Sequence, residues 1–167
     1  MTGGAIRTIH GDMKGLILRS CTSFLLLLFV SCSLASAQEN NLEQYVSRFS
    51  YQERRDMKID SKELVRLIKE NKVQFVDIRF KEEFEAWRMG FGINIPLNEL
   101  PGRLNELDRN RLIVTACPHK DRATIAMVYL RTKGFRVRYL EDGLVGLAEH
   151  LRGDRARDFL KRDAGHN

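Results

Sequence analysis

The chain has 167 residues, of which 43% are hydrophobic and 30% charged, and its formal net charge is +6. This length suits one ordinary domain of about 100–150 residues, and the composition excludes a disordered chain and a collagen-like chain. The three cysteines, at positions 21, 32 and 117, are too few for a disulfide framework, and an odd number cannot all pair within the chain. The chain is therefore expected to fold around an apolar core.

The first 37 residues have the pattern of a secretory signal peptide. Three basic residues precede a charge-free, largely apolar stretch at positions 20–38, and small residues occupy positions 35–37. The pattern predicts cleavage before Gln38 and export, to the periplasm. Two alternatives remain open. An uncleaved leader would anchor the chain, because its 19 uncharged residues lie near the lower limit of about 17–25 for a membrane span, and Cys32 could carry a lipid.

Cleavage would change the charge and the cysteine count. It would remove three of the 28 basic residues and one of the 22 acidic residues, which leaves a net charge of +4 on a mature chain with one cysteine, Cys117. A lone cysteine in an exported protein is either a buried, inert residue or a thiol that is used.

The first half of the mature chain predicts a helix and a strand after a polar start. Residues 38–58 are rich in charge and are expected to form a linker or an arm that lies on the domain. Asp60 and Glu63 fit a capping box, and apolar residues at helical spacing predict a helix over 61–71. The run of β-formers at 73–78 then predicts a buried strand of a parallel sheet.

The remaining elements continue the alternation of helix and strand. The pattern predicts, in chain order, a short helix at 81–87, an extended piece at 93–96, a helical piece at 98–107, a strand at 112–116, a helix at 123–130, a strand at 135–139 and a helix at 144–151. This order predicts an α/β domain over residues 59–152, with a mainly parallel central sheet and helices on both faces. Residues 153–167 are expected to be a polar tail.

Cys117 follows the strand at 112–116 and precedes a helix, which is where open α/β sheets place their ligand sites. Backbone N–H groups at a helix start favour an anion and lower the pKa of a thiol. Lys120 and Arg122 add positive charge. The loop therefore predicts that Cys117 is a thiolate at neutral pH and acts as a nucleophile. The alternative is a cysteine that only packs at the end of the strand.

Five segments of the chain resemble the rhodanese domain over about residues 58–151. They are Phe-Val-Asp-Ile-Arg at 75–79, Glu-Glu-Phe at 82–84, Ile-Asn-Ile-Pro-Leu at 93–97, Cys117-x-x-x-x-Arg122, and Tyr-Leu-Glu-Asp-Gly-Leu at 139–144. The resemblance implies a single rhodanese-like module in which Cys117 takes a sulfane sulfur from a donor such as thiosulfate. The resulting persulfide would pass that sulfur to a thiol or to cyanide, without a metal or organic cofactor.

The length of the cysteine loop separates the neighbouring chemistries of this superfamily. Cys117 to Arg122 is a six-residue loop, which resembles the sulfur-handling members, whereas the related cell-cycle phosphatases carry one residue more. A cysteine-dependent phosphatase therefore fits less well, and the sequence shows no obvious general acid for an alkoxide leaving group. A second alternative is a rhodanese-like module that binds a partner without catalysis.

The loop side chains receive roles that follow from this resemblance and from their charge. Cys117 is expected to be the nucleophile and persulfide carrier. Arg122 is expected to stabilise the loop or the anionic donor, or else to form a structural salt bridge. Lys120 would attract thiosulfate or stabilise the persulfide, or remain a solvated charge. His119 would move a proton or lie at the rim of the pocket.

Residues outside the loop are expected to act as scaffold rather than to touch substrate. Asp77 and Arg79 belong to the first motif and are expected to hold the strand and the loop together, and Trp87 is expected to pack. The Lys and Arg residues are interleaved with acidic residues, without a basic cluster or an aromatic platform, so no nucleic-acid partner is expected. The expected partners are a small anionic sulfur donor and a thiol or cyanide acceptor. Membrane contact is expected only if the leader is retained or Cys32 is lipidated.

Overall fold

The structure is a computed structural model that describes residues 42–163. Of the described residues, 45–163 belong to one compact unit, and the helical residues 42–44 belong to another. The predicted signal peptide, its cleavage site and Cys32 lie outside the described residues, as do the last four residues of the predicted tail. Within the described part of the chain, no helix is both long and apolar enough to cross a membrane.

A five-stranded parallel sheet forms the centre of the domain, in the strand order β1-β5-β4-β2-β3. The strands are β1 (Lys58–Ile59), β2 (Val73–Asp77), β3 (Ile93–Asn94), β4 (Leu112–Ala116) and β5 (Val137–Leu140). All neighbouring strands are parallel, so their carboxyl ends lie at one edge of the sheet. The predicted α/β class with a mainly parallel sheet is confirmed.

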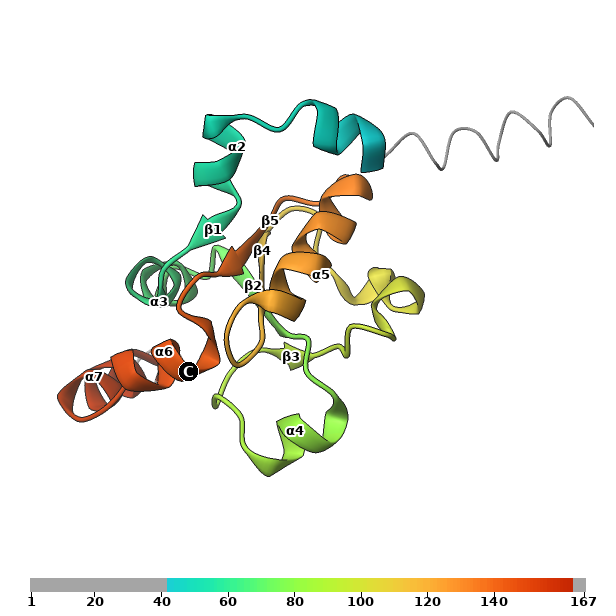
Figure 1. The fold of residues 1–167 in the computed structure, drawn as a ribbon. Helices are drawn as coiled ribbons and strands as arrows, with labels where there is room; N and C mark the ends of the chain where they lie inside the picture. Colours follow the sequence, from blue (N-terminus) through green and yellow to red (C-terminus); the bar gives the residue numbers. More distant parts are fainter. Residues whose placement is uncertain (1–41, 164–167) are drawn as a thin grey trace, which may run out of the picture. The chain divides into compact units, whose positions relative to one another are not determined.

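Helices cover both faces of this sheet (Figure 1). On one face, α5 (Asp121–Thr132) buries apolar side chains against β4 and β5. On the other face lie α3 (Ser61–Lys69), α6 (Gly143–His150) and α7 (Asp154–Asp163), which share a second apolar cluster. The sheet thus has a core on each side, which explains why β2 and β4 are nearly continuous runs of apolar residues.

The start of α3 shows how local sequence fixes an element. The Asp60 side chain accepts a hydrogen bond from the backbone N–H of Glu63, with 2.7 Å between Oδ1 and N. Leu64, Val65 and Leu67 follow at helical spacing and are buried. The predicted helix start is confirmed, and such a cap is worth about 1 kcal/mol to a helix.

The polar segment before the domain contains structure that its composition did not indicate. Residues Tyr51–Asp56 form helix α2, and Lys58 and Ile59 pair with Tyr139 and Leu140 as the edge strand β1. A two-residue strand is too short for a period-two pattern to reveal. Helix α2 is attached to the domain, since Arg131 forms an ion pair with Glu53. Helix α2 and β1 therefore contact the domain, whereas residues 38–41 of the expected linker or arm lie outside the described residues.

Two further segments differ from the sequence expectations. The helical piece expected at 98–107 is two short 3₁₀ turns, η1 (Leu100–Gly102) and η2 (Leu104–Glu106), because Pro101 removes a backbone donor from that stretch. Within the expected polar tail, Asp154–Asp163 form α7, in which Phe159 is buried against Phe91 at 5.2 Å between ring centroids. One buried aromatic among charged residues gives too weak a periodic signal to predict.

Candidate active site

Cys117 lies at the carboxyl end of β4, in the loop that connects this strand to α5. The loop is held by the start of α6, because the carbonyl oxygen of Cys117 accepts the N–H of Leu144 at 2.9 Å. The carbonyl oxygen of Pro118 accepts the N–H of Val145 at 3.3 Å. The predicted position of the cysteine at a strand end is thus confirmed.

Gly143 allows the loop and α6 to approach this closely. Its φ is +65°, and a Cβ there would lie 2.3 Å from the carbonyl oxygens of both Pro118 and His119. No side chain fits at that distance, and the left-handed backbone also disfavours one. Sequence reasoning noted this glycine only as part of a motif.

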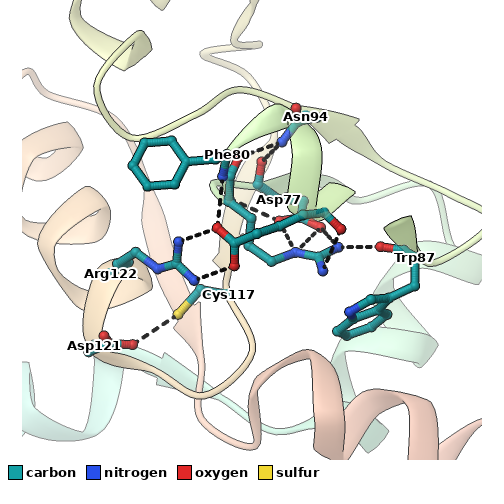
Figure 2. Close-up of polar contacts among 9 residues, drawn as sticks. Asp77, Phe80, Trp87, Asn94, Cys117, Asp121 and Arg122 are labelled. Atoms are coloured by element: carbon teal, nitrogen blue, oxygen red, sulfur yellow. Dashed lines mark hydrogen bonds and ion pairs between the residues drawn. The ribbon is translucent and has the colours of Figure 1, made fainter. Parts of the chain in front are cut away.

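The sulfur of Cys117 is in contact with one carboxylate, that of Asp121. Its Sγ donates a hydrogen bond to Oδ1 of Asp121, with 3.4 Å between the two atoms (Figure 2). The backbone amides of His119 and Ala123 act in the opposite direction to this carboxylate and lower the pKa of the thiol. The sulfur thus has backbone amides in its own loop and one carboxylate in direct contact.

The prediction that Cys117 is a thiolate at neutral pH is wrong for this arrangement. Burial raises the pKa of the Cys117 thiol above its ordinary value, and the Asp121 carboxylate raises it further, against the lowering effect of the two loop amides. The sequence pattern placed two cations near the thiol but did not reveal this carboxylate contact. Cys117 is therefore a thiol at neutral pH in this structure.

Arg122, one of the two expected cations, is paired with Glu83 of α4 (Lys81–Ala86). Its two terminal nitrogens donate to the two carboxylate oxygens at 2.6 and 2.9 Å (Figure 2). These bonds hold the pKa of Glu83 below its usual range. The ring of Phe80, which is about half exposed, lies 5.9 Å from the guanidinium carbon. The salt bridge expected as one role of Arg122 is present.

A buried ion pair between Asp77 and Arg79 positions α4. Arg79 is fully buried, and its Nη2 lies 2.6 Å from Oδ2 of Asp77. The same guanidinium donates to the backbone carbonyl of Glu83 at 3.3 Å and to that of Trp87 at 2.8 Å. Its guanidinium carbon lies 4.2 Å from the centroid of the Trp87 ring. The expected scaffold role of the two motif residues agrees with these contacts.

Asn94 of β3 completes this scaffold, and sequence reasoning missed it. Its side-chain amide donates to the carbonyl oxygens of Asp77 and Arg79, each at 2.9 Å. The sequence pattern also does not single out Glu83, in the Glu-Glu-Phe segment, or Asp121, in the cysteine loop. The available signal is that each residue is a carboxylate within a segment that resembles the family, where it can pair with a loop cation or contact the thiol.

His119 and Lys120 are exposed at the tip of the loop. Within the described residues, neither side chain forms a hydrogen bond or an ion pair, so their expected roles toward a donor remain predictions. Among the same residues, no group of three His, Cys, Asp or Glu side chains is placed to hold a metal ion.

A separate cavity of about 680 Å³ opens at the opposite edge of the sheet. Its lining includes Arg131, Arg136 and Arg138, near the amino ends of the strands. The Cys117 loop does not line it, so it is not part of the site described above.

The sequence and the fold match known proteins. The family model described as the rhodanese-like domain matches residues 60–150. A sulfurtransferase of Allochromatium vinosum is 32% identical over 94 residues, which cover 55% of this chain and 88% of that protein. An HTH-type transcriptional regulator of Mycobacterium tuberculosis, Rv0324, is 38% identical over 85 residues, which cover 50% of this chain and only 38% of that protein.

A solved structure shows the same fold at similar coverage. The rhodanese-like domain protein from Staphylococcus aureus superposes with a TM-score of 0.51 at 27% identity, covering 54% of this chain and 89% of that one. Residues 60–150, which the family model matches, contain the cysteine loop, the Arg122–Glu83 ion pair and the buried Asp77–Arg79 pair. On the strength of the family match and of this fold, the chain belongs to the rhodanese-like family.

Proposed function

We propose that this protein is an exported sulfurtransferase that moves a sulfane sulfur through a persulfide on Cys117. The donor is a sulfane compound such as thiosulfate, and the acceptor is a thiol or cyanide. The observation that carries the proposal is the position of Cys117 at the carboxyl end of β4, where the backbone amides of His119 and Ala123 favour its thiolate form. The similarity to a sulfurtransferase supports the same activity.

The first step forms the persulfide. The Cys117 thiol loses its proton to solvent, and Sγ attacks the outer sulfur of thiosulfate. The Sγ–S bond forms as the S–S bond of the donor breaks, and sulfite leaves with the electron pair of that bond. Amides directed at one point of a loop favour an anion there, so the same N–H groups can stabilise the persulfide anion.

The second step returns the enzyme to its starting state. Cyanide, or the thiolate of an acceptor, attacks the terminal sulfur of the persulfide. The bond between Sγ and that sulfur breaks, and Cys117 leaves as a thiolate that regains a proton from solvent. The products are thiocyanate or the persulfide of the acceptor. All atoms and charges are accounted for without a metal or an organic cofactor.

Steady-state turnover separates this proposal from its alternatives. The purified protein with thiosulfate and cyanide should form thiocyanate, and Cys117→Ser should abolish it. A phosphatase would instead hydrolyse an aryl phosphate in a reaction that depends on Cys117. A binding module would catalyse neither reaction and would retain a partner in both the native protein and Cys117→Ser. Absence of thiocyanate with every sulfane donor and acceptor tried would overturn the proposal.

Export rests on the leader pattern of residues 1–37. We expect the protein expressed in a bacterial host to appear in the periplasmic fraction and to begin at Gln38 when its amino terminus is sequenced. A cytoplasmic chain that retains residues 1–37 would contradict this part of the proposal and leave the sulfur chemistry untouched.

A further inference from the structure

The charged side chain in contact with the sulfur is an acid, whereas a site that binds anions usually places basic side chains there. Among the described residues, Asp121 is the one charged side chain that hydrogen-bonds to Sγ of Cys117, at 3.4 Å. Backbone N–H groups at the start of α5 hold the pKa of the Asp121 carboxyl below its usual range. Asp121 is therefore negatively charged at neutral pH, directly beside the reacting atom.

The two arginines Arg122 and Arg79 are each paired with a carboxylate. Arg122 is bound at two points by Glu83 of α4. At the end of β2, Arg79 is bound by Asp77. These two pairs supply little net positive charge to a ligand at Cys117.

The other polar and charged side chains near the loop form no hydrogen bond with the sulfur among the described residues. His119 and Lys120 are exposed at the tip of the loop. Asp142, at the start of α6, accepts the backbone N–H of Ser61 at 2.8 Å. The charge that directly contacts the reacting sulfur is thus negative.

We infer that Asp121 determines the donor specificity of the Cys117 site, by disfavouring donors that bring two negative charges and leaving donors of lower charge as the preferred class. Persulfides of thiols and thiosulfonates belong to that class, and thiosulfate, a dianion, does not. This inference rests on the proposed sulfurtransferase function and names the substrate class for the same site.

The physical reason is repulsion between like charges: the exposed Asp121 carboxylate lies directly beside the sulfur of the buried Cys117. A donor must bring its sulfane sulfur to bonding distance of Sγ, which also brings its other charges near the Asp121 carboxylate. Repulsion rises with each added negative charge, and salt screens it little at separations well below the Debye length of about 10 Å. Unfavourable contacts with the wrong ligand are a general source of specificity.

The test compares two donors in which the same kind of bond is broken. Thiosulfate carries two negative charges and methanethiosulfonate carries one, and in both a sulfane sulfur leaves a sulfonyl-type sulfur. Asp121→Asn removes the charge while its amide oxygen can still accept the N–H groups of α5. We expect the ratio of kcat/KM for thiosulfate to that for methanethiosulfonate to rise about tenfold. Asp154→Asn, at the first turn of α7, is the matched control and should leave the ratio unchanged.

A second readout does not depend on turnover. Alkylation by iodoacetamide, a neutral reagent, is followed on the Cys117 peptide as a function of pH. We expect Asp121→Asn to lower the midpoint by about one pH unit, because the thiolate no longer faces a like charge. Asp154→Asn should keep the midpoint of the unmodified protein.

The outcomes separate this inference from the proposed function. Turnover with an unchanged donor ratio in Asp121→Asn overturns the inference and leaves the sulfurtransferase function standing, as does an unchanged alkylation midpoint. Failure of the unmodified protein and both variants to take sulfur from either donor overturns the function together with the inference that rests on it.

Discussion

Glu83 and Arg122 form a two-point ion pair that joins α4 to the cysteine loop, with N–O distances of 2.6 and 2.9 Å. The partners are 39 positions apart in the chain. The guanidinium of the buried Arg79 holds α4 in place by donating hydrogen bonds to the backbone carbonyl oxygens of Glu83 and Trp87. The first motif therefore acts on the loop indirectly, by placing the carboxylate that holds Arg122.

Release of Arg122 should improve the binding of an anionic donor. In Glu83→Gln the amide can still accept the N–H of Phe80, which the carboxylate accepts at 3.2 Å, but the charge that neutralises Arg122 is lost. We expect the KM for thiosulfate to fall about threefold, measured by thiocyanate formation. Glu82→Gln, an exposed neighbour on the same helix, is the control and should not change KM. An unchanged or higher KM in Glu83→Gln would show that Arg122 does not act on the donor.

Loss of the buried charge at Asp77 should destabilise the whole domain. Asp77→Asn keeps the shape of the side chain but leaves the guanidinium of Arg79 buried without a counter-charge. We expect the free energy of unfolding in urea to fall by about 3–5 kcal/mol. Asp158→Asn removes one partner of an exposed pair and should cost less than about 1 kcal/mol. Equal effects of the two substitutions would contradict the scaffold role of the buried pair.

Substitution of two glycines that share a backbone conformation separates the cost of backbone strain from the cost of a steric clash with the loop. Gly143 and Gly153 have φ of +65° and +62°, but a Cβ would meet loop carbonyls at 2.3 Å only at Gly143, with nothing within 4 Å at Gly153. Gly153→Ala should cost about 1–2 kcal/mol from backbone strain alone.

Gly143→Ala should cost clearly more in urea unfolding, because the loop must also move. It should in addition slow alkylation of Cys117, which Gly153→Ala should leave unchanged. Similar losses of stability in the two variants, with normal Cys117 reactivity in both, would show that the loop tolerates displacement from α6.

The last described helix should contribute to stability through one residue. Phe159 is 5% exposed, whereas its neighbour Leu160 is 64% exposed. Phe159→Ala should lower the free energy of unfolding by about 3 kcal/mol, while Leu160→Ala should change it by less than about 0.5 kcal/mol. Thermal or urea unfolding measures both. A negligible effect of Phe159→Ala would mean that α7 is dispensable for the fold.

The elements that local sequence predicts best are those with a strong local cause. The strands at 73–77 and 112–116 are nearly continuous apolar runs that are largely buried, and the start of α3 is marked by the Asp60 cap. The place of Cys117 follows directly from the second strand and the helix after it. These features depend on neighbours in the chain, so the sequence pattern contains them.

The charge state of the site depends instead on partners distant in the chain. Arg122 looks like a free cation in the loop until Glu83 is brought to it by the buried Arg79. Asp121 is close in sequence, but only the folded loop shows that its carboxylate faces the sulfur. The same reason explains β1 and α7, whose contacts lie far from them along the chain.

The most direct test of the central claim is the intact mass of the protein after exposure to a sulfane donor. The reduced protein is incubated with thiosulfate or methanethiosulfonate, freed of donor and weighed, and the added mass is then located by peptide mapping. We predict a gain of one sulfur atom on Cys117 that is absent in Cys117→Ser and is removed by cyanide or a thiol. No gain from any sulfane donor, or a gain that persists in Cys117→Ser, would contradict sulfur transfer through this cysteine.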